Sequence, residues 1–501
     1  MSPRRRLSLA LAGALASACQ LHDVAASPLP PVDLPDGYTA GGEDEDGRDV
    51  DPDRWWLSFG DPELTYLVEE ALARNFQLGA AWARLEQAER GVQAASSAWW
   101  PQISAQLDAA RRRQVVVFGA LGRQEFEVDS FGISLPVSYE LDVWNRVGHS
   151  VAAGSLEAVA ARDDVETLAM TIAASVVEAW LELIQQRSVR ALLDDQLETN
   201  RIYSELVALR FAHGLGTALD VHQQRQQFEA TQAQLAQADG AERVARLQLA
   251  VLVGRPPGAF AADRIGSLPE PTVLPPPPPL PRTGIPAHLL LTRPDVRAAR
   301  RRVEAQDHRV GAAIADLFPA LRFNGAIGLS SPTLEGLVTS LVYSIGGSIL
   351  ATVLDGGRRD AEIRANRAAL RERLQMFGHT LLTAMLEVES ALARDRQIES
   401  QGERLEEQLA AARSALTESR RRYSEGLSDY LPVLTSLAAV QQLEQIVLTT
   451  KRARLSQRVQ LARALGGAWT RELEPPRLPM PRRGDRDADE DASSEPAEEA
   501  R

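Results

Sequence analysis

Cysteine and excess positive charge are two features that this sequence lacks. It has one cysteine, Cys19, in 501 residues. A single thiol cannot form an internal disulfide bond or a site built from several thiolates. Lysine and arginine total 55 against 68 aspartates and glutamates, which gives a net charge of −13. Because a nucleic-acid-binding face must be basic, no nucleic-acid partner is expected.

Motifs that would indicate catalysis are also missing. The seven histidines form no H-E-x-x-H pair, and the sequence has no P-loop and no G-x-S-x-G motif. Gly214 and Gly216 have neither a third glycine nor a preceding strand, so they do not form a dinucleotide-binding loop. The sequence therefore predicts no enzyme, no cofactor and no metal ion.

Residues 1–18 have the pattern of an export signal. Arginines at 4–6 precede an apolar stretch at 7–15 that is too short to span a bilayer, and small residues follow it. Two interpretations fit: an ordinary A-x-A cleavage site, or a sequence that resembles a bacterial lipobox, in which Cys19 is lipidated. The position of the sole cysteine favours lipidation. Gln20 is not the aspartate that retains bacterial lipoproteins in the inner membrane, so this resemblance implies sorting to the outer membrane.

One arrangement of elements occurs twice along the chain. Gly214 and Gly426 stand 212 positions apart, each preceded by an arginine and an aromatic residue. Pro101 and Pro319 each follow a predicted helix of about 25 residues, since helices usually end before a proline. Such self-similarity predicts two tandem copies of one structural unit.

Each copy contains a proline-free stretch, at 145–210 and at 358–423, that predicts a single helix. Each helix would be roughly 100 Å long. Helices of this length fit a tube or a coiled coil rather than a compact domain. The predicted organisation is a signal peptide (1–18), a lipid-anchored linker (19–61), the first repeat (62–256), a Pro-rich linker (257–286), the second repeat (287–467) and a charged, disordered tail (468–501).

Four segments alternate apolar and polar residues with a period of two, at about 103–117, 126–141, 321–331 and 337–353. The last has no charge, but its apolar residues fall on odd positions such as Ile345, which favours a strand over a transmembrane helix. Such strands predict a membrane β-barrel; a soluble four-stranded sheet packed on the helices is the alternative. Four strands cannot close a barrel, so three copies would have to supply twelve.

These features together resemble the TolC-like outer-membrane efflux proteins, in particular the lipoprotein (NodT-like) branch that serves resistance-nodulation-division pumps. The resemblance covers residues 53–467. The motifs that carry it are Trp55-Trp56, Phe59-Gly60-Asp61-Pro62-Glu63-Leu64, Trp100-Pro101-Gln102, Tyr139-Glu140-Leu141-Asp142-Val143-Trp144 and Leu354-Asp355-Gly356-Gly357-Arg358.

The resemblance implies a mainly α fold with membrane β-structure, in which a trimeric α-helical barrel continues into a twelve-stranded β-barrel. It implies an exit duct that passes small molecules from an inner-membrane pump and a periplasmic adaptor to the exterior, without catalysis. The alternative is a periplasmic coiled-coil scaffold or adaptor without a pore, attached to the outer-membrane lipid by Cys19 alone. Four strands that are apolar on one side favour the duct.

In this family, polar contacts close the periplasmic aperture. The resemblance places Asp220 at the family's aspartate and Tyr423 at its tyrosine, whereas Ser428 stands where the family has an arginine. Arg210, Arg421 and Arg422 are near enough in sequence to replace it. From the residues alone, two simpler roles stay open: Asp220 as an acid at a helix N-terminus that the helix dipole stabilises, and Tyr423 as a residue that packs against the neighbouring helix. The aperture candidates are Asp220, Tyr423, Arg210, Arg422, Ser428 and Asp429.

Overall fold

The computed structural model describes residues 22–24, 31–39, 52–117, 123–260, 273–281 and 286–475. The predicted signal at 1–18 and the lipidation candidate Cys19 lie outside these residues, as does most of the predicted tail.

Six helices dominate the structure, three in each repeat. The lengths agree between the repeats: α4 and α8 have 67 residues each, and α5 and α9 have 35 each. The two predicted long helices are confirmed to within two residues at each end. The helices are α3 (Phe76–Ser96), α4 (Arg146–Ala212) and α5 (Ala218–Leu252) in the first repeat, and α7 (Pro294–Ala315), α8 (Arg358–Ser424) and α9 (Leu431–Leu465) in the second.

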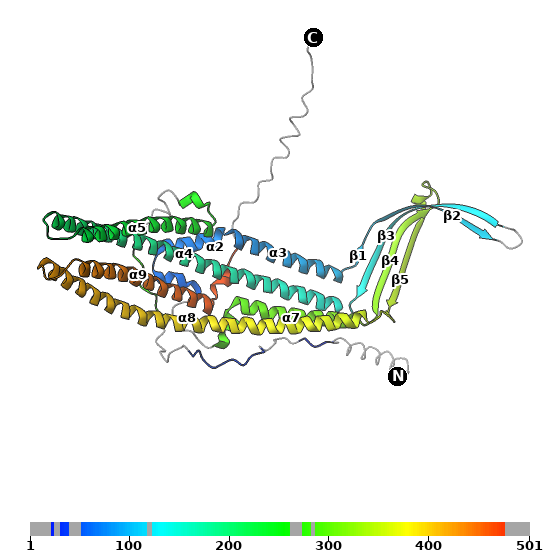
Figure 1. Ribbon diagram of the computed structural model, residues 1–501. Coiled ribbons are helices and arrows are strands. Elements are labelled where there is room, and N and C mark those ends of the chain that lie inside the picture. The colour runs from blue at the N-terminus through cyan, green and yellow to red at the C-terminus, as the bar shows by residue number, and fades with distance from the viewer. Residues whose placement is uncertain are drawn as a thin grey trace, which may run out of the picture.

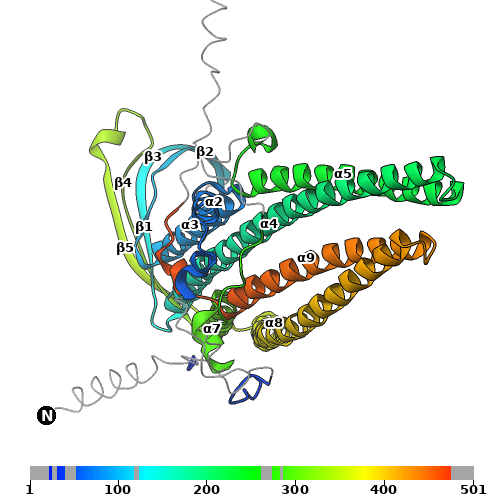
Figure 2. The ribbon, with the colours of Figure 1, turned by 90° about the vertical axis from the view of Figure 1, so that its left-hand side faces the viewer.

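Shorter helices connect these elements. They are α2 (Pro62–Arg74), α6 (Leu289–Thr292) and the 3-10 segments η1 (Pro52–Phe59), η2 (Ser97–Trp99), η4 (Pro257–Phe260), η5 (Pro286–His288), η6 (Leu337–Thr339) and η7 (Trp469–Glu472). Figures 1 and 2 show that α4 runs beside α5 and α8 beside α9, with both hairpin turns at one end of the molecule and the sheet at the other.

The same local device starts α4 and α8. Before α4, the carboxylate of Asp142 accepts hydrogen bonds from the backbone N–H groups of Val147 and Gly148, at 3.0 and 2.7 Å. Before α8, Asp355 accepts from the backbone N–H of Gly357 at 3.0 Å and from that of Arg359, in the first turn, at 3.4 Å. Because the first N–H groups of a helix have no partner within it, each aspartate stabilises the strand-to-helix turn of its repeat.

The sheet is antiparallel and has the order β1-β3-β4-β5, with β2 also paired to β3. Because β1 and β2 pair with the same strand, they occupy the place of the one strand predicted at 103–117. The other predicted strands correspond to β3, β4 and β5. The strands are β1 (Gln102–Ile103), β2 (Gln106–Val117), β3 (Arg123–Leu141), β4 (Ala320–Ser331) and β5 (Leu341–Leu350).

The strand predicted at 337–353 is too long. Residues 337–339 form the 3-10 turn η6, in which the backbone N–H of Ser340 donates to the carbonyl of Leu337 at 3.4 Å. The alternation already fails there, because Leu337 and Val338 are both apolar. The strand β5 therefore begins only at Leu341.

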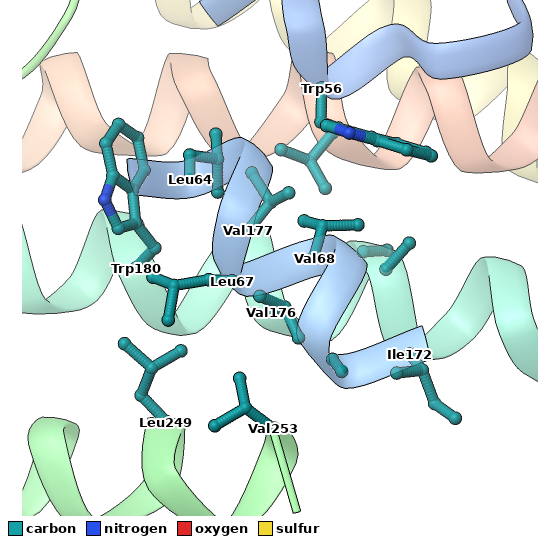
Figure 3. Close-up of a cluster of buried hydrophobic side chains, with 14 of the residues drawn as sticks. Trp56, Leu64, Leu67, Val68, Ile172, Val176, Val177, Trp180, Leu249 and Val253 are labelled. Carbon is teal, nitrogen blue, oxygen red and sulfur yellow. The ribbon is translucent and has the colours of Figure 1, made fainter. Parts of the chain in front are cut away.

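The main hydrophobic core lies where α2 packs on the middle of α4 and the end of α5. Leu64, Leu67 and Val68 of α2 lie against Val176, Val177 and Trp180 of α4, and Leu249 and Val253 complete the cluster (Figure 3). In length and composition, α4 and α9 could each cross a membrane, but 61% of the apolar stretch of α4 is buried in the protein. The apolar residues of α4 therefore serve this core.

The predicted disordered tail begins too early. Residues 468–475 are ordered, and the ring of Trp469 lies 4.9 Å from that of Trp56 in an edge-to-face arrangement. The Thr470 hydroxyl donates to Glu166 at 3.1 Å. The composition of the tail is charged, but this short piece of it is held by an aromatic contact that composition does not reveal.

Candidate functional site: the strand face and the hairpin tips

One face of the sheet is apolar across all its strands. Antiparallel pairing places Ile133 of β3 opposite Leu329 of β4, and Leu329 opposite Leu341 of β5. The next row joins Ile327 to Tyr343. These side chains face outward: Tyr343 is 74% exposed, and Ile345 and Ile349 are 87% and 73% exposed. A contiguous exposed apolar patch of this kind marks a surface that contacts another protein or a membrane.

The opposite face is small and polar. Ser138 lies opposite Asn324, whose amide donates to the Ser348 hydroxyl at 3.3 Å. A groove of about 480 Å³ on the sheet is lined mainly by residues of this kind, including Ser104 and Ser344. A sheet that is apolar outside and polar inside has the two faces that a membrane barrel presents to lipid and to its lumen.

The apolar face ends abruptly along the β2–β3 hairpin. Phe131 is its last apolar residue on β3, and the next residue on that face, Asp129, contacts Arg111 at 3.3 Å. Arg111 also binds Glu127 at 3.3 Å, and Arg113 pairs with Glu125. Placing a charged side chain in the hydrocarbon core of a bilayer costs much free energy. The change from Phe131 to Asp129 therefore marks an outer boundary of the lipid-facing band.

Neither edge of the sheet is paired. Within the described part of the chain, β5 bonds only to β4, and β1 and β2 bond only to β3. Unpaired backbone groups are not tolerated in a bilayer, because lipid offers them no hydrogen-bond partner. A lipid-embedded sheet of this form is therefore incomplete without further strands.

The two hairpin tips have the same backbone geometry. After α4, Gly214 takes a φ of 72°, and the N–H of Leu215 donates to the carbonyl of Arg210 at 2.8 Å. After α8, Gly426 takes a φ of 75°, and the N–H of Leu427 donates to the carbonyl of Arg422 at 2.8 Å. Positive φ costs glycine little, which is why glycine stands at both tips.

Asp220 caps the helix that follows the first tip. Its carboxylate accepts from the backbone N–H of Thr217 at 2.9 Å, and its own N–H donates to the Thr217 hydroxyl at 3.2 Å. This reciprocal pair is a capping box at the start of α5. Asp220 therefore lies in the first turn of α5, the position that the sequence left open for it, and it holds that position through a capping box.

Arg210 and Tyr423 meet between the hairpins. The guanidinium of Arg210 lies 4.3 Å from the centre of the Tyr423 ring, and Tyr423 is only 7% exposed. The Tyr423 ring also lies 5.4 Å from that of Tyr430. Burial raises the pKa of Tyr423, and the Asp220 carboxylate acts in the same direction, while Arg210 opposes them. The structure thus brings Arg210, Tyr423 and Asp220 into one neighbourhood.

The other three candidates are at the second tip. Ser428 is half-buried and, among the described residues, its hydroxyl has no hydrogen-bond partner. Arg422 and Asp429 are exposed to solvent. The cation near the tyrosine is therefore Arg210 of the first hairpin, and Arg422 does not take that position.

A buried amide network joins the hairpins farther from the tips, and the sequence analysis missed it. Asn200 of α4 donates to the hydroxyl of Thr231 on α5 at 2.8 Å, and Gln441 of α9 donates to the Asn200 amide oxygen at 3.2 Å. Gln224 of α5 accepts from the Tyr430 hydroxyl at 2.6 Å, and its side-chain amide donates to the backbone carbonyl of Asn200 at 3.0 Å. The sequence is rich in glutamine, and nothing in it distinguishes these buried amides from the solvent-exposed ones.

The comparisons identify the family. The chain matches the family model described as "Outer membrane efflux protein" over residues 67–255 and 285–467. It is 31% identical over 477 residues to the "Pyoverdine export outer membrane protein OpmQ" of Pseudomonas aeruginosa. The match covers 91% of this chain and 96% of that protein. It is 26% identical over 409 residues to "Nodulation protein T" of Rhizobium leguminosarum bv. trifolii, with 81% and 85% covered.

Solved structures agree with this assignment. A membrane protein from Pseudomonas aeruginosa has a TM-score of 0.80 at 26% identity, with 90% of this chain and 98% of that chain covered. The apolar strand face has no use in a periplasmic coiled-coil scaffold, whereas it suits a membrane channel. The chain belongs to the outer membrane efflux protein family, and it is an outer-membrane exit duct of an efflux system.

Proposed function

We propose that three copies of this chain assemble into one duct, in which twelve strands close a barrel through the outer membrane. The two unpaired sheet edges carry this proposal, because each edge of one protomer then pairs with the opposite edge of the next. A closed barrel leaves no backbone group unpaired in lipid. The lumen continues between the long helices into the periplasm.

The helices also leave apolar surface for such an assembly. In α9, an apolar stretch long enough to cross a membrane is only 28% buried in the single protomer. On α8, Met376, Leu382 and Leu386 are about half exposed or more. Contact between neighbouring protomers would cover surface of this kind and close the helical barrel.

The duct requires partners, because nothing in its described residues supplies energy for transport. We assign that role to an inner-membrane pump, which a periplasmic adaptor connects to the hairpin tips. The duct itself performs no catalysis and needs no cofactor. A lipid on Cys19 would fasten each protomer to the outer membrane in addition to its strands.

The hairpin tips form the periplasmic aperture in this proposal. The Arg210–Tyr423 contact joins the two hairpins of a protomer where they end, and the amide network of Asn200 and Gln441 joins them farther up. Both must part, or move together, for the tips to separate. Asp220 supports the aperture by fixing the start of α5.

A matched pair of arginine substitutions tests the barrel. Ile345→Arg places a charge on the apolar face, which should abolish assembly in the outer membrane. Ser344→Arg places the same charge one residue away, on the polar face, and should leave assembly intact. The measurement is the amount of heat-resistant oligomer in outer-membrane fractions. Equal amounts of oligomer in both variants would exclude the proposed lipid face.

A further inference from the structure

A second contact between an arginine and a tyrosine joins the two hairpins, farther from the tips than the first. The guanidinium of Arg420 on α8 lies 5.0 Å from the centre of the ring of Tyr203 on α4. Tyr203 is only 9% exposed and belongs to the same buried cluster as Tyr423 and Tyr430. The contact is the reverse of that between Arg210 and Tyr423, because here α4 supplies the ring and α8 supplies the cation.

The two contacts lie at different depths in the protomer. On α4, Tyr203 and Arg210 are seven residues apart, which is two helical turns or roughly 10 Å. Val207 lies between them on α4 and is buried. Sites separated by more than about 7–10 Å usually contribute independently. Loss of the Tyr203 ring should therefore leave the Arg210 contact in place.

Arg420 is the one of three consecutive arginines that faces α4. Successive residues of a helix point about 100° apart, so residues 420–422 cannot share a partner. Arg421 pairs with Glu418 and Glu425 of its own helix end, at 2.7 and 2.8 Å. Arg420 forms no ion pair with any residue that the structure describes. Its guanidinium is therefore free to contact the tyrosine ring.

The two repeats differ at both positions of this contact. The offset of 212 positions that relates the two tips gives Ala415 as the counterpart of Tyr203 and Ala208 as the counterpart of Arg420. Alanine has neither an aromatic ring nor a charge, so the reversed pair cannot form it. Each protomer thus has one such contact, and two identical repeats would have none.

The surrounding cluster connects all four helices of the hairpins. Tyr430, which immediately precedes α9, is buried, and its ring lies 5.4 Å from that of Tyr423 on α8. Its hydroxyl donates to Gln224 of α5 at 2.6 Å. Burial raises the pKa of Tyr203 on α4, while the charge of Arg420 and a hydrogen bond from it oppose this shift. Movement of either hairpin would disturb this packing.

We propose that Tyr203 and Arg420 form a second tie of the periplasmic aperture, which opposes separation of the hairpins independently of the Arg210–Tyr423 contact. This inference rests on the proposed aperture at the hairpin tips. Tyr203 and Arg420 are positioning residues, because they hold α4 and α8 together without touching a transported molecule. The hairpins of one protomer separate only when both contacts are lost.

A matched set of arginine substitutions tests the tie through the resting conductance of the mature duct in planar bilayers. Arg420→Gln removes the charge but keeps a long polar side chain, and it should raise the opening equilibrium about two- to fivefold for each protomer. Arg420→Lys keeps a cation for the ring and should give a conductance between those of Arg420→Gln and the wild type. Arg421→Gln is the control and should stay closed. A conductance of Arg420→Gln no higher than that of Arg420→Lys would overturn the tie.

A double variant tests whether the two side chains act through each other. Tyr203→Leu should leak as much as Arg420→Gln, and the two substitutions together should leak no more than the stronger one alone, because they remove the same contact. Tyr203→Leu combined with Arg210→Ala should instead multiply the two effects. Multiplied effects of Tyr203→Leu and Arg420→Gln would contradict a direct tie.

The single variant Arg210→Ala separates this inference from the aperture on which it rests. If Arg210→Ala leaks and Arg420→Gln conducts as the wild type does, the second tie is refuted and the aperture at the tips stands. If neither variant leaks, both the tie and the aperture are refuted. Leakage in both variants is the result that the second tie predicts.

Discussion

The guanidinium of Arg210 lies over the ring of Tyr423, 4.3 Å from its centre, and so joins α4 of the first hairpin to α8 of the second. The Tyr423 hydroxyl is buried and has no hydrogen-bond partner among the described residues. The contact that joins the hairpins is therefore made by the aromatic face of Tyr423 rather than by its hydroxyl.

This geometry predicts different resting conductances for two substitutions of Tyr423, to alanine and to phenylalanine. Tyr423→Ala and Arg210→Ala should each raise the resting conductance of the duct in planar bilayers, because a cation–π contact worth about 0.5–2 kcal/mol is lost, equivalent to about two- to thirtyfold in an opening equilibrium. The duct with Tyr423→Phe should stay closed, because phenylalanine keeps the aromatic face that Arg210 contacts. Arg421→Ala is the control, since Arg421 pairs with Glu418 and Glu425 of its own helix end. A leaky Tyr423→Phe would show that the hydroxyl makes the tie.

The capping box gives a second prediction, which concerns Asp220. Thr217→Ala and Asp220→Ala should lower the thermal unfolding midpoint to a similar extent, because each removes one half of a cap worth about 0.5–2 kcal/mol. Glu229→Ala, on the exposed face of α5, should have little effect. If Asp220→Ala alone raises the conductance, Asp220 has an aperture role beyond the cap.

The amide network should behave as one coupled unit. Asn200→Leu removes the oxygen that accepts from the Gln441 amide N–H in a buried site, at a cost of about 1–3 kcal/mol, whereas the Thr231 hydroxyl keeps its hydrogen bond to the Gln227 carbonyl. Gln441→Met should be costly for the same reason, and the double variant should recover part of the loss. Chemical unfolding gives the four free energies of this cycle. Additive effects, within about 0.5 kcal/mol, would rule out the network; exposed Gln226→Leu is the control.

Substitution of Cys19 separates the two proposed membrane attachments. Cys19→Ser should remove the lipid, which intact-mass spectrometry detects, yet the strands should still assemble into oligomers in the membrane fraction. A soluble, monomeric Cys19→Ser protein would mean that the lipid is the only membrane contact.

The strands and long helices could be predicted because their signals are local. The alternation around Ile345 fixes which face of a strand is apolar, and the absence of proline from 145 to 210 lets one helix run through. The start of β5 was missed because the two apolar neighbours Leu337 and Val338 fit either a strand or a turn. The ordered end at Trp469 depends on a distant partner, Trp56.

The candidate site was predictable only in part, because its contacts join residues far apart in sequence. The resemblance brought Asp220 and Tyr423 to attention, but it did not reveal that Arg210 faces the tyrosine across 213 positions. Asn200 and Gln441 are 241 positions apart, and nothing local distinguishes a buried amide from a solvated one.

The native mass of the duct, extracted in detergent from outer-membrane fractions, tests the central claim most directly. The open edges of the sheet require partners, so the account predicts a mass of three chains, with no monomer in equilibrium. A stable monomer extracted from the outer membrane would contradict the trimeric barrel, because one protomer cannot satisfy its own sheet edges in lipid.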